Sequence, residues 1–289
     1  MQLVNAKGMI KRAKEGNYAI PAFNINNLEW IKSVLTACER AKSPVILETS
    51  ESAVKYMGGY KNVYDMVKNI GDFLNITIPV CLHLDHGTYE GAFKALEAGY
   101  TSVMFDGSKL SIEDNVSKVK EVVEYAKKFN ASVEGEVGGI GGTEDGVTSV
   151  GELACPTECK MLVETGIDML AAGIGNIHGK YPDDWQGLNF DRLKEIESAC
   201  KGTPLVLHGG SGIPSDMVQR AIRHGVSKVN VNTELQLAFA ANTRIYIEEG
   251  KDLEGKGFDP RKLLKPGCQG IEDTVLEKLE MFYTVGKAL

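Results

Sequence analysis

Residues 79–87, PVCLHLDHG, begin as a continuous apolar run and end in two ionisable side chains, Asp85 and His86. Apolar residues at successive rather than alternate positions are typical of a parallel strand that is covered on both faces. Ionisable residues at the carboxyl end of such a strand indicate that this end opens onto a site. The segment therefore predicts a buried parallel strand with functional groups at its last residues.

Seven other short runs repeat this pattern, and segments of helical period separate them. The runs are residues 18–24, 44–50, 102–108, 132–139, 168–175, 204–211 and 228–234. Between runs, residues 28–42 and 112–130 place apolar side chains at the spacing of one helix face. Strands that alternate regularly with helices predict the α/β class and, with eight of them, a single (β/α)8 TIM barrel.

The predicted barrel covers residues 1–289 as one domain, because no linker-like stretch divides the chain. Additional C-terminal helices are expected from about residue 250. A doubly wound parallel sheet is the alternative architecture, but eight strands that are each followed by a helix fit a closed barrel better. In a barrel, the residues at the carboxyl ends of the strands form the active site.

Composition argues against several classes of protein. The chain has a net charge of −7 and no run of Lys and Arg, so a nucleic-acid partner is not expected. No stretch reaches the length of a membrane span, and the N-terminal segment has no apolar signal region. The six cysteines include no C-x-x-C pair. Reduced thiols and a cytoplasmic location are therefore expected.

Three histidines fall at the carboxyl ends of three different predicted strands: His86, His178 and His208. Three neutral imidazoles with one open position match a catalytic zinc site. The remaining two histidines are predicted to lie away from this rim. His224 ends a helix that leads to the opposite end of the barrel, and His83 lies one layer below the rim, where a supporting role is expected.

Glycine-rich segments follow the last two predicted strands, where TIM barrels commonly bind phosphate. Residues 208–212, HGGSG, expose backbone N–H groups, and residues 230–233, NVNT, end the eighth strand. Residues 173–179 and 138–144 come close to a dinucleotide fingerprint but lack the third glycine at the required spacing. A phosphorylated ligand is therefore expected, and a nicotinamide cofactor is not.

Several motifs form a specific combination over nearly the whole chain. They are HLDHG (83–87), VEGEVGGIGGTEDG (133–146), GNIHG (175–179), VLHGGSGIP (206–214) and KVNVNTE (228–234), with NNLEW, KYMGGY, FDGS and DPRK between and beyond them. This combination resembles the class II, zinc-dependent fructose-1,6-bisphosphate aldolases of Gram-positive and related bacteria. The resemblance implies a TIM barrel that forms a homodimer or homotetramer. It also implies reversible cleavage of fructose-1,6-bisphosphate to dihydroxyacetone phosphate and glyceraldehyde-3-phosphate, in glycolysis or gluconeogenesis.

The resemblance also implies the roles of the catalytic groups. The zinc ligands would be His86, His178 and His208. Glu136 matches a carboxylate near an alternative metal position, and Asp85 matches the acid/base that acts on the C4 hydroxyl. Glu144, on the glycine-rich loop that follows residue 139, matches the residue that transfers a proton at C3 of dihydroxyacetone phosphate.

A substrate-binding set is implied in the same way. It comprises Asn24, Ser50, Gly179, Lys180, Gly209, Ser211, Asn230, Asn232, Thr233, Asp259 and Arg261. The C1-phosphate pocket within this set would also hold a monovalent cation, Na⁺ or K⁺. Asp259 and Arg261 match a lid pair that reaches the distal phosphate from a neighbouring subunit. Asn232 stands where relatives carry an aspartate, and Gln236 where some carry an arginine, so the contacts to the far end of the sugar differ.

Other functions stay open at this point. A tagatose-1,6-bisphosphate aldolase, or another ketose-phosphate aldolase, would keep the same metal and C1-phosphate groups. A barrel zinc hydrolase and a non-enzymatic metal or sugar-phosphate binder are further alternatives. A Schiff-base aldolase is disfavoured, because Lys228 is at the start of its predicted strand and Lys180 lies in a loop.

Overall fold

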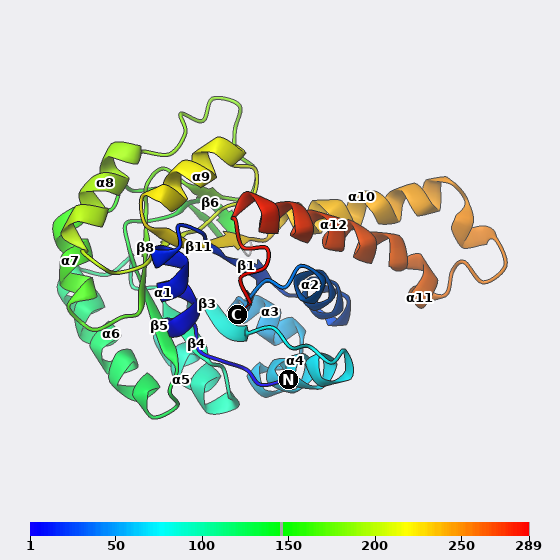
Figure 1. Ribbon diagram of the computed structural model, residues 1–289, viewed down its shortest axis with the longest axis horizontal. Helices are drawn as coiled ribbons and strands as arrows, with labels where there is room; N and C mark the ends of the chain where they lie inside the picture. Colours follow the sequence, from blue (N-terminus) through cyan, green and yellow to red (C-terminus); the bar gives the residue numbers. More distant parts are fainter. Residues whose placement is uncertain (145–146, 289) are drawn as a thin grey trace.

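The computed structural model describes residues 1–144 and 147–288, and of residues 143–144 and 147–149 it describes the backbone alone. Eight parallel strands close into a barrel in the order β1-β11-β10-β8-β5-β4-β3-β2 (Figure 1). They are β1 (Ile20–Asn24), β2 (Val45–Thr49), β3 (Val80–Gly87), β4 (Ser102–Phe105), β5 (Ser132–Val137), β8 (Met169–Ala172), β10 (Leu205–Leu207) and β11 (Val226–Val231). Each lies within one of the predicted runs or begins within two residues of it, which confirms the predicted TIM barrel.

A layer of helices surrounds the barrel and covers the outer face of its strands. It comprises α2 (Leu28–Arg40), α3 (Glu51–Tyr56), α4 (Tyr60–Phe73), α5 (Tyr89–Ala98), α6 (Ile112–Lys127), α7 (Pro156–Val163), α8 (Phe190–Ala199) and α9 (Ser215–Arg223). Local chemistry fixes their ends. The Ser111 hydroxyl accepts a hydrogen bond from the Asp114 N–H at 3.2 Å at the start of α6. Gly99 ends α5 with a φ of 107°, which glycine adopts without strain.

The first helix, α1 (Lys7–Glu15), closes the amino-terminal end of the barrel. Its apolar residues Met9, Ile10 and Ala13 are buried and pack with inward-facing side chains of the strands, such as Ile20 and Met104. Figure 1 shows this helix lying across the barrel opening. With that end filled, the opposite rim, where the strands reach their carboxyl ends, is the part of the barrel interior that a ligand can enter.

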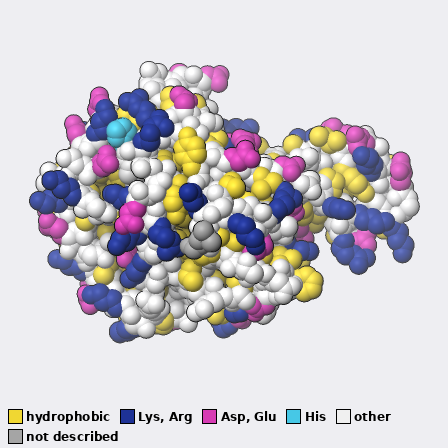
Figure 2. Space-filling model, viewed as in Figure 1, with side chains coloured by type: hydrophobic (Ala, Val, Ile, Leu, Met, Phe, Trp, Pro, Cys, Tyr) yellow, Lys and Arg dark blue, Asp and Glu magenta, His cyan; other side chains and the backbone are white. Residues whose placement is uncertain are grey.

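The C-terminal part of the chain forms a helical arm that projects from the barrel (Figure 1). The arm consists of α10 (Thr233–Glu248), a short 3-10 turn (Lys251–Leu253), α11 (Pro260–Leu263) and α12 (Lys265–Met281). Helix α12 returns alongside α10 and packs on α2. Figure 2 shows Lys and Arg side chains gathered near the tip of the arm and apolar side chains along it. Within the described residues, none of the helices has the length and apolar character that a membrane span requires.

The glycine-rich segment after β5 was expected to be a loop, and the structure corrects this. Strands β6 (Gly141–Glu144), β7 (Val147–Ser149) and β9 (Ile177–His178) form a separate small sheet in the order β7-β6-β9. Gly142 has a φ of 88°, and a Cβ atom there would lie 2.1 Å from the carbonyl oxygen of His178. The glycines therefore allow two backbones to approach closely and pair, rather than only loosening the chain.

Candidate active site

Three imidazole rings meet at the carboxyl rim of the barrel. His86 is the second-last residue of β3, His178 lies in β9 just beyond β8, and His208 directly follows β10. The Nε2 atom of His86 is 2.9 Å from Nδ1 of His208, and the ring centroids of His86 and His178 are 4.9 Å apart. One ring nitrogen from each residue lies within 4.8 Å of the other two. This spacing fits three nitrogen ligands around one tetrahedral ion.

Backbone geometry and a carboxylate fix the orientation of His86. Its φ of 46° lies in the left-handed region, which is uncommon for a residue other than glycine. The ladder between β3 and β4 shifts register at this point, between Leu84 and Gly87. Nδ1 of His86 lies 3.2 Å from Oδ2 of Asp106, which leaves Nε2 to face the other histidines. Strain of this kind is found where the surrounding structure holds a functional side chain in place.

A chain of buried ionisable side chains supports His208 from below. Nε2 of His208 donates to Oε1 of Glu134 at 2.8 Å, and Nζ of Lys228 donates to Oε2 of the same carboxylate at 2.8 Å. Glu48 approaches Lys228 at 3.3 Å, and all of these side chains are buried. Burial lowers the pKa of Lys228, but the carboxylates of Glu134 and Glu48 outweigh it and raise that pKa, so the ammonium stays charged. A buried, charged lysine of this kind is no nucleophile for a Schiff base.

The environment keeps His178 and His208 neutral near pH 7. Burial, together with the nearby His86, lowers the pKa of His178 to about 4. Burial and His86 also hold the pKa of His208 well below its usual range. Neutral imidazole is the form that binds a metal ion. The three nitrogen donors therefore suit zinc. In catalytic sites, zinc typically has three protein ligands and one open coordination position.

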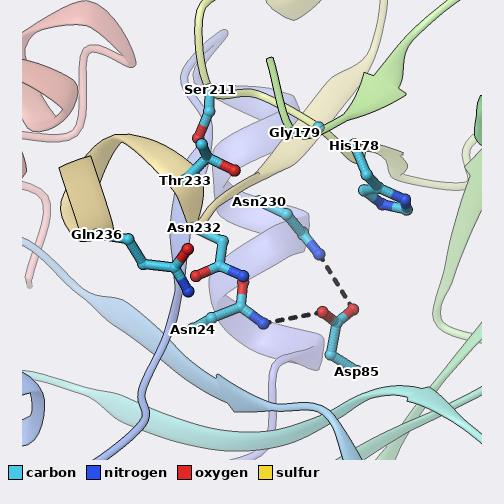
Figure 3. A pocket seen from close by; sticks show the side chains of 10 residues that line it. Asn24, Asp85, His178, Gly179, Ser211, Asn230, Asn232, Thr233 and Gln236 are labelled. Atoms are coloured by element: carbon cyan, nitrogen blue, oxygen red, sulfur yellow. Dashed lines mark hydrogen bonds between the residues drawn. The ribbon is translucent and has the colours of Figure 1, made fainter. Parts of the chain in front are cut away.

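Asp85 lies beside the histidines as a buried carboxylate. Nδ2 of Asn24 donates to its Oδ2 at 3.0 Å, and Nδ2 of Asn230 donates to its Oδ1 at 3.2 Å (Figure 3). Burial raises the pKa of Asp85, but the neighbouring imidazoles of His86 and His208, the ammonium of Lys228 and the hydrogen bond from Asn24 outweigh it and lower the pKa to about 2. The group is therefore an ionised base at neutral pH, held in one orientation by two amides from different strands.

A cavity of 270 Å³ opens beside Asp85 at the ends of β1, β10 and β11. It is lined by Asn24, Asp85, His178, Gly179, Gly209, Ser211, Asn230, Asn232, Thr233 and Gln236 (Figure 3). Helix α10 begins at this cavity, so its positive end faces the space. Gly209 has a φ of 64°, and a Cβ atom there would lie 2.1 Å from the carbonyl oxygen of Ile177. The pocket thus joins backbone donors to a helix terminus, which is an arrangement that binds anions.

A second, larger cavity of 850 Å³ lies on the other side of His86 and His178. His86, Asp106 and Glu136 form another cluster there with a spacing that could hold a metal ion. Oε2 of Glu136 is buried without a hydrogen-bond partner among the described residues, and burial together with Asp106 raises the pKa of this carboxyl well above its usual range. Ser50, which caps α3 by accepting from the Ala53 N–H at 3.3 Å, also lines this cavity.

Besides His208, which lines neither cavity, four predicted residues lie outside these cavities or cannot be placed. Lys180 follows Gly179 and is exposed. Asp259 and Arg261 form an ion pair with each other, Oδ2 to Nη2 at 2.6 Å, at the far end of the arm. Glu144 belongs to β6 by its backbone, but its side chain lies outside the described residues.

The two remaining histidines do not take part in the cluster at the rim. His83 is fully buried, with Nδ1 at 2.8 Å from Oγ of Ser102, and His224 pairs with Glu197 at 3.4 Å on the outside of the barrel. Sequence reasoning missed Asp106, although it directly follows the fourth barrel strand, in the motif FDGS, and Asp85 likewise lies near the end of the third. It also gave no role to Glu134, which only barrel closure brings to Lys228.

A barrel with three histidines that could hold a metal ion, next to a polar cavity at the carboxyl rim, is the arrangement of a metal-dependent barrel enzyme. Residues 4–287 match the family model of class II fructose-bisphosphate aldolase. The chain is 55% identical over 288 residues to the fructose-bisphosphate aldolase of Mycoplasma pneumoniae, which covers 99% of this chain and 100% of the relative. It is 50% identical over 293 residues to the enzyme of Streptococcus pyogenes serotype M1, with 100% of both chains covered.

Solved structures agree with these relatives. The YdjI aldolase of Escherichia coli K12 superposes with a TM-score of 0.83 at 30% identity, covering 100% of both chains. The chain belongs to the class II fructose-bisphosphate aldolases, a family of metal-dependent lyases. The family and the activity predicted from the motifs are thereby confirmed.

Proposed function

We propose that the protein uses zinc, held by His86, His178 and His208, in the reversible aldol cleavage of fructose-1,6-bisphosphate. The observation that carries this proposal is the convergence of three imidazoles beside the buried carboxylate of Asp85. When bound there, zinc would act as a Lewis acid that stabilises the negative charge left on the ketone half. Glu136 would serve an alternative metal position. Two observations support this: its buried Oε2 atom has no hydrogen-bond partner among the described residues, and the side chain lies beside His86 and Asp106.

Asp85 would accept the proton of the C4 hydroxyl while the C3–C4 bond breaks, and would return it in the condensation direction. Its pKa of about 2 keeps it ionised, and Asn24 and Asn230 leave it one orientation. Glu144 would protonate the ketone half at C3. Its place on the small β6–β7–β9 sheet, paired with the segment of His178, supports this role.

The substrate would lie across both cavities. Gly179, Gly209 and Ser211, with the amino-terminal end of α10 at Thr233, would hold the C1 phosphate, and a monovalent cation, Na⁺ or K⁺, would bind nearby. Asn230 and Asn232 would contact the sugar hydroxyls. Ser50, in the second cavity, and Lys180, beside Gly179, would contact the distal half.

We propose a homodimer or homotetramer. The projecting arm supports this, because it exposes apolar side chains that a single chain does not cover, such as Leu237, Ile245 and Phe258. Asp259 and Arg261, at the tip of the same arm, would then reach the active site of a neighbouring subunit. The free cysteines support a reducing, cytoplasmic setting. Light scattering on the purified protein tests the assembly.

A comparison of the two C4 epimers tests the substrate. We expect kcat/KM for fructose-1,6-bisphosphate to exceed that for tagatose-1,6-bisphosphate, because the curated relatives at 50–55% identity are fructose-bisphosphate aldolases. Equal or faster turnover of the tagatose epimer would reject the fructose assignment. Release of inorganic phosphate without triose phosphates would instead indicate a hydrolase.

A further inference from the structure

A buried lysine outside the catalytic groups lies behind the phosphate pocket. Lys278, in the last turn of α12, is 2% exposed, and its Nζ lies 2.7 Å from Oε2 of Glu234. The second carboxylate near this ammonium is Glu277, which is 3.7 Å away and has a 68% exposed side chain. Burial of a lysine charge is unfavourable unless a partner lies close. Glu234 is therefore the partner that holds Lys278 at this position.

Glu234 in turn contacts the glycine-rich loop of the pocket. The N–H of Gly212 donates to Oε1 of Glu234 at 3.0 Å, and the N–H of Glu234 donates to Oγ of Ser211 at 3.3 Å. Ser211 and Thr233 both line the phosphate pocket and lie on the same side of it in Figure 3. A continuous series of polar contacts thus connects α12, through Glu234, to the loop that forms the pocket.

The charge of Glu234 makes this connection important for ligand binding. Glu234 lies in the first turn of α10, where the positive end of the helix attracts a carboxylate. The same helix end faces the pocket in which the C1 phosphate is placed. A carboxylate that contacts the loop of this pocket would repel a phosphate dianion bound there, unless a cation balances its charge. Lys278 is that cation.

We propose that Lys278 is a positioning residue that sets the affinity of this pocket for phosphate by neutralising the Glu234 carboxylate, which fixes the loop at the N–H of Gly212. The proposal rests on the proposed function only in placing the C1 phosphate in this pocket. Lys278 takes no part in breaking the C3–C4 bond. Its effect is therefore on binding of the phosphorylated ligand and not on the chemical step.

Steady-state kinetics on the zinc-loaded protein separate an effect on substrate binding from an effect on the chemical step. In Lys278→Met, KM for fructose-1,6-bisphosphate should rise by about tenfold, the order expected for one unbalanced charge near a phosphate. The kcat should stay within about twofold of the wild-type value. Glu277→Gln is the matched control, because it removes an exposed carboxylate near the same ammonium, and it should change neither constant.

A double variant distinguishes charge balance from simple loss of packing. Lys278→Met with Glu234→Gln removes both charges, so it should recover most of the lost affinity, and Lys278→Arg should retain it. If Lys278→Met does not fold, Lys278→Arg and Glu234→Gln still test the proposal, because Glu234→Gln alone should lower KM. A double variant as weak as Lys278→Met, or a fall in kcat with KM unchanged, would overturn the proposal.

Binding without turnover makes the result independent of the substrate assignment. Thermal-shift titrations with inorganic phosphate and with dihydroxyacetone phosphate should show weaker binding to Lys278→Met than to wild type. If wild type cleaves no fructose-1,6-bisphosphate, the proposed function fails while these titrations still test Lys278. Equal phosphate affinity in the two proteins would overturn the role of Lys278.

Discussion

Nε2 of His208 lies 2.8 Å from Oε1 of Glu134, and this contact determines which nitrogen of the ring faces the site. Because Nε2 donates to the carboxylate, Nδ1 is the unprotonated nitrogen, and it lies 2.9 Å from Nε2 of His86. Lys228 holds the other oxygen of Glu134. The orientation of a candidate ligand therefore depends on charges in the layer below it, as in other metal sites whose histidines donate to carboxylates.

Removal of the supporting lysine should weaken metal binding. In Lys228→Met, Glu134 and Glu48 lose their shared cation, and we expect zinc affinity to fall by about 10- to 100-fold. Competition with a chromophoric chelator measures the affinity, and the absorption spectrum of the cobalt-substituted protein reports ligand geometry. Lys61→Met, which breaks an exposed pair with Asp65, is the control. Unchanged zinc affinity in Lys228→Met would show that Glu134 is positioned without it.

Loss of one ligand should remove metal and activity together. We expect His208→Ala to purify with little zinc and to lose activity, because the metal site would retain two of its three histidines. Metal analysis of the purified variant, with kinetics on the same sample, provides the measurement. His224→Ala is the matched control, since His224 lies outside the cluster and pairs with Glu197. Full zinc content in His208→Ala would exclude it as a ligand.

Loss of the base should separate metal binding from turnover. Asp85→Ala should retain zinc, because Asp85 is not a member of the histidine cluster, while kcat falls by about 10²- to 10⁴-fold. Zinc content and the rate of triose phosphate formation are measured on one preparation. Substantial activity in this variant would mean that another group accepts the C4 hydroxyl proton.

The stability of the metal-free protein should depend on pH through His178. The pKa of His178 is about 4 in the folded chain and 6.5 in the unfolded chain. As pH falls, the unfolded chain therefore binds the proton first. This contribution is fully present above pH 6.5 and is lost as pH falls towards 4, by about 3 kcal/mol for this group. Urea unfolding at pH 7 and pH 4.5 measures it.

A variant isolates that contribution from other buried groups. Glu136 titrates with the opposite sign, because its raised pKa adds stability as pH falls. The difference between wild type and His178→Gln cancels such common terms. We expect His178→Gln to lose less stability than wild type over this pH interval. An equal loss in both proteins would contradict the burial effect on His178.

The sequence reveals the local part of this architecture. Strands covered on both faces leave continuous apolar runs, and the residues that end these runs, such as His86 and His208, must meet at one rim once the barrel closes. The periodicity within each helix, and the cap at Ser111, are likewise local. Such features depend on neighbours in the chain, so a single sequence contains enough information to predict them.

The supporting contacts could not be predicted, because they form between distant strands. Lys228 and Glu134 are 94 positions apart and meet only inside the closed barrel. Asp106 carries no local mark that separates a histidine partner from an ordinary turn residue. The left-handed φ of His86 arises from a register shift between two strands, which no pattern in the chain shows. The small β6–β7–β9 sheet depends on close approach of two backbones at Gly142.

The most direct test of the central claim is the rate of fructose-1,6-bisphosphate cleavage by one preparation before chelation, after chelation and after zinc is restored. We predict about one zinc per chain in the active protein, loss of activity with removal of the metal, and recovery when zinc is added. Triose phosphate formation that persists at the original rate in the metal-free protein would contradict the assignment of His86, His178 and His208 as a catalytic metal site.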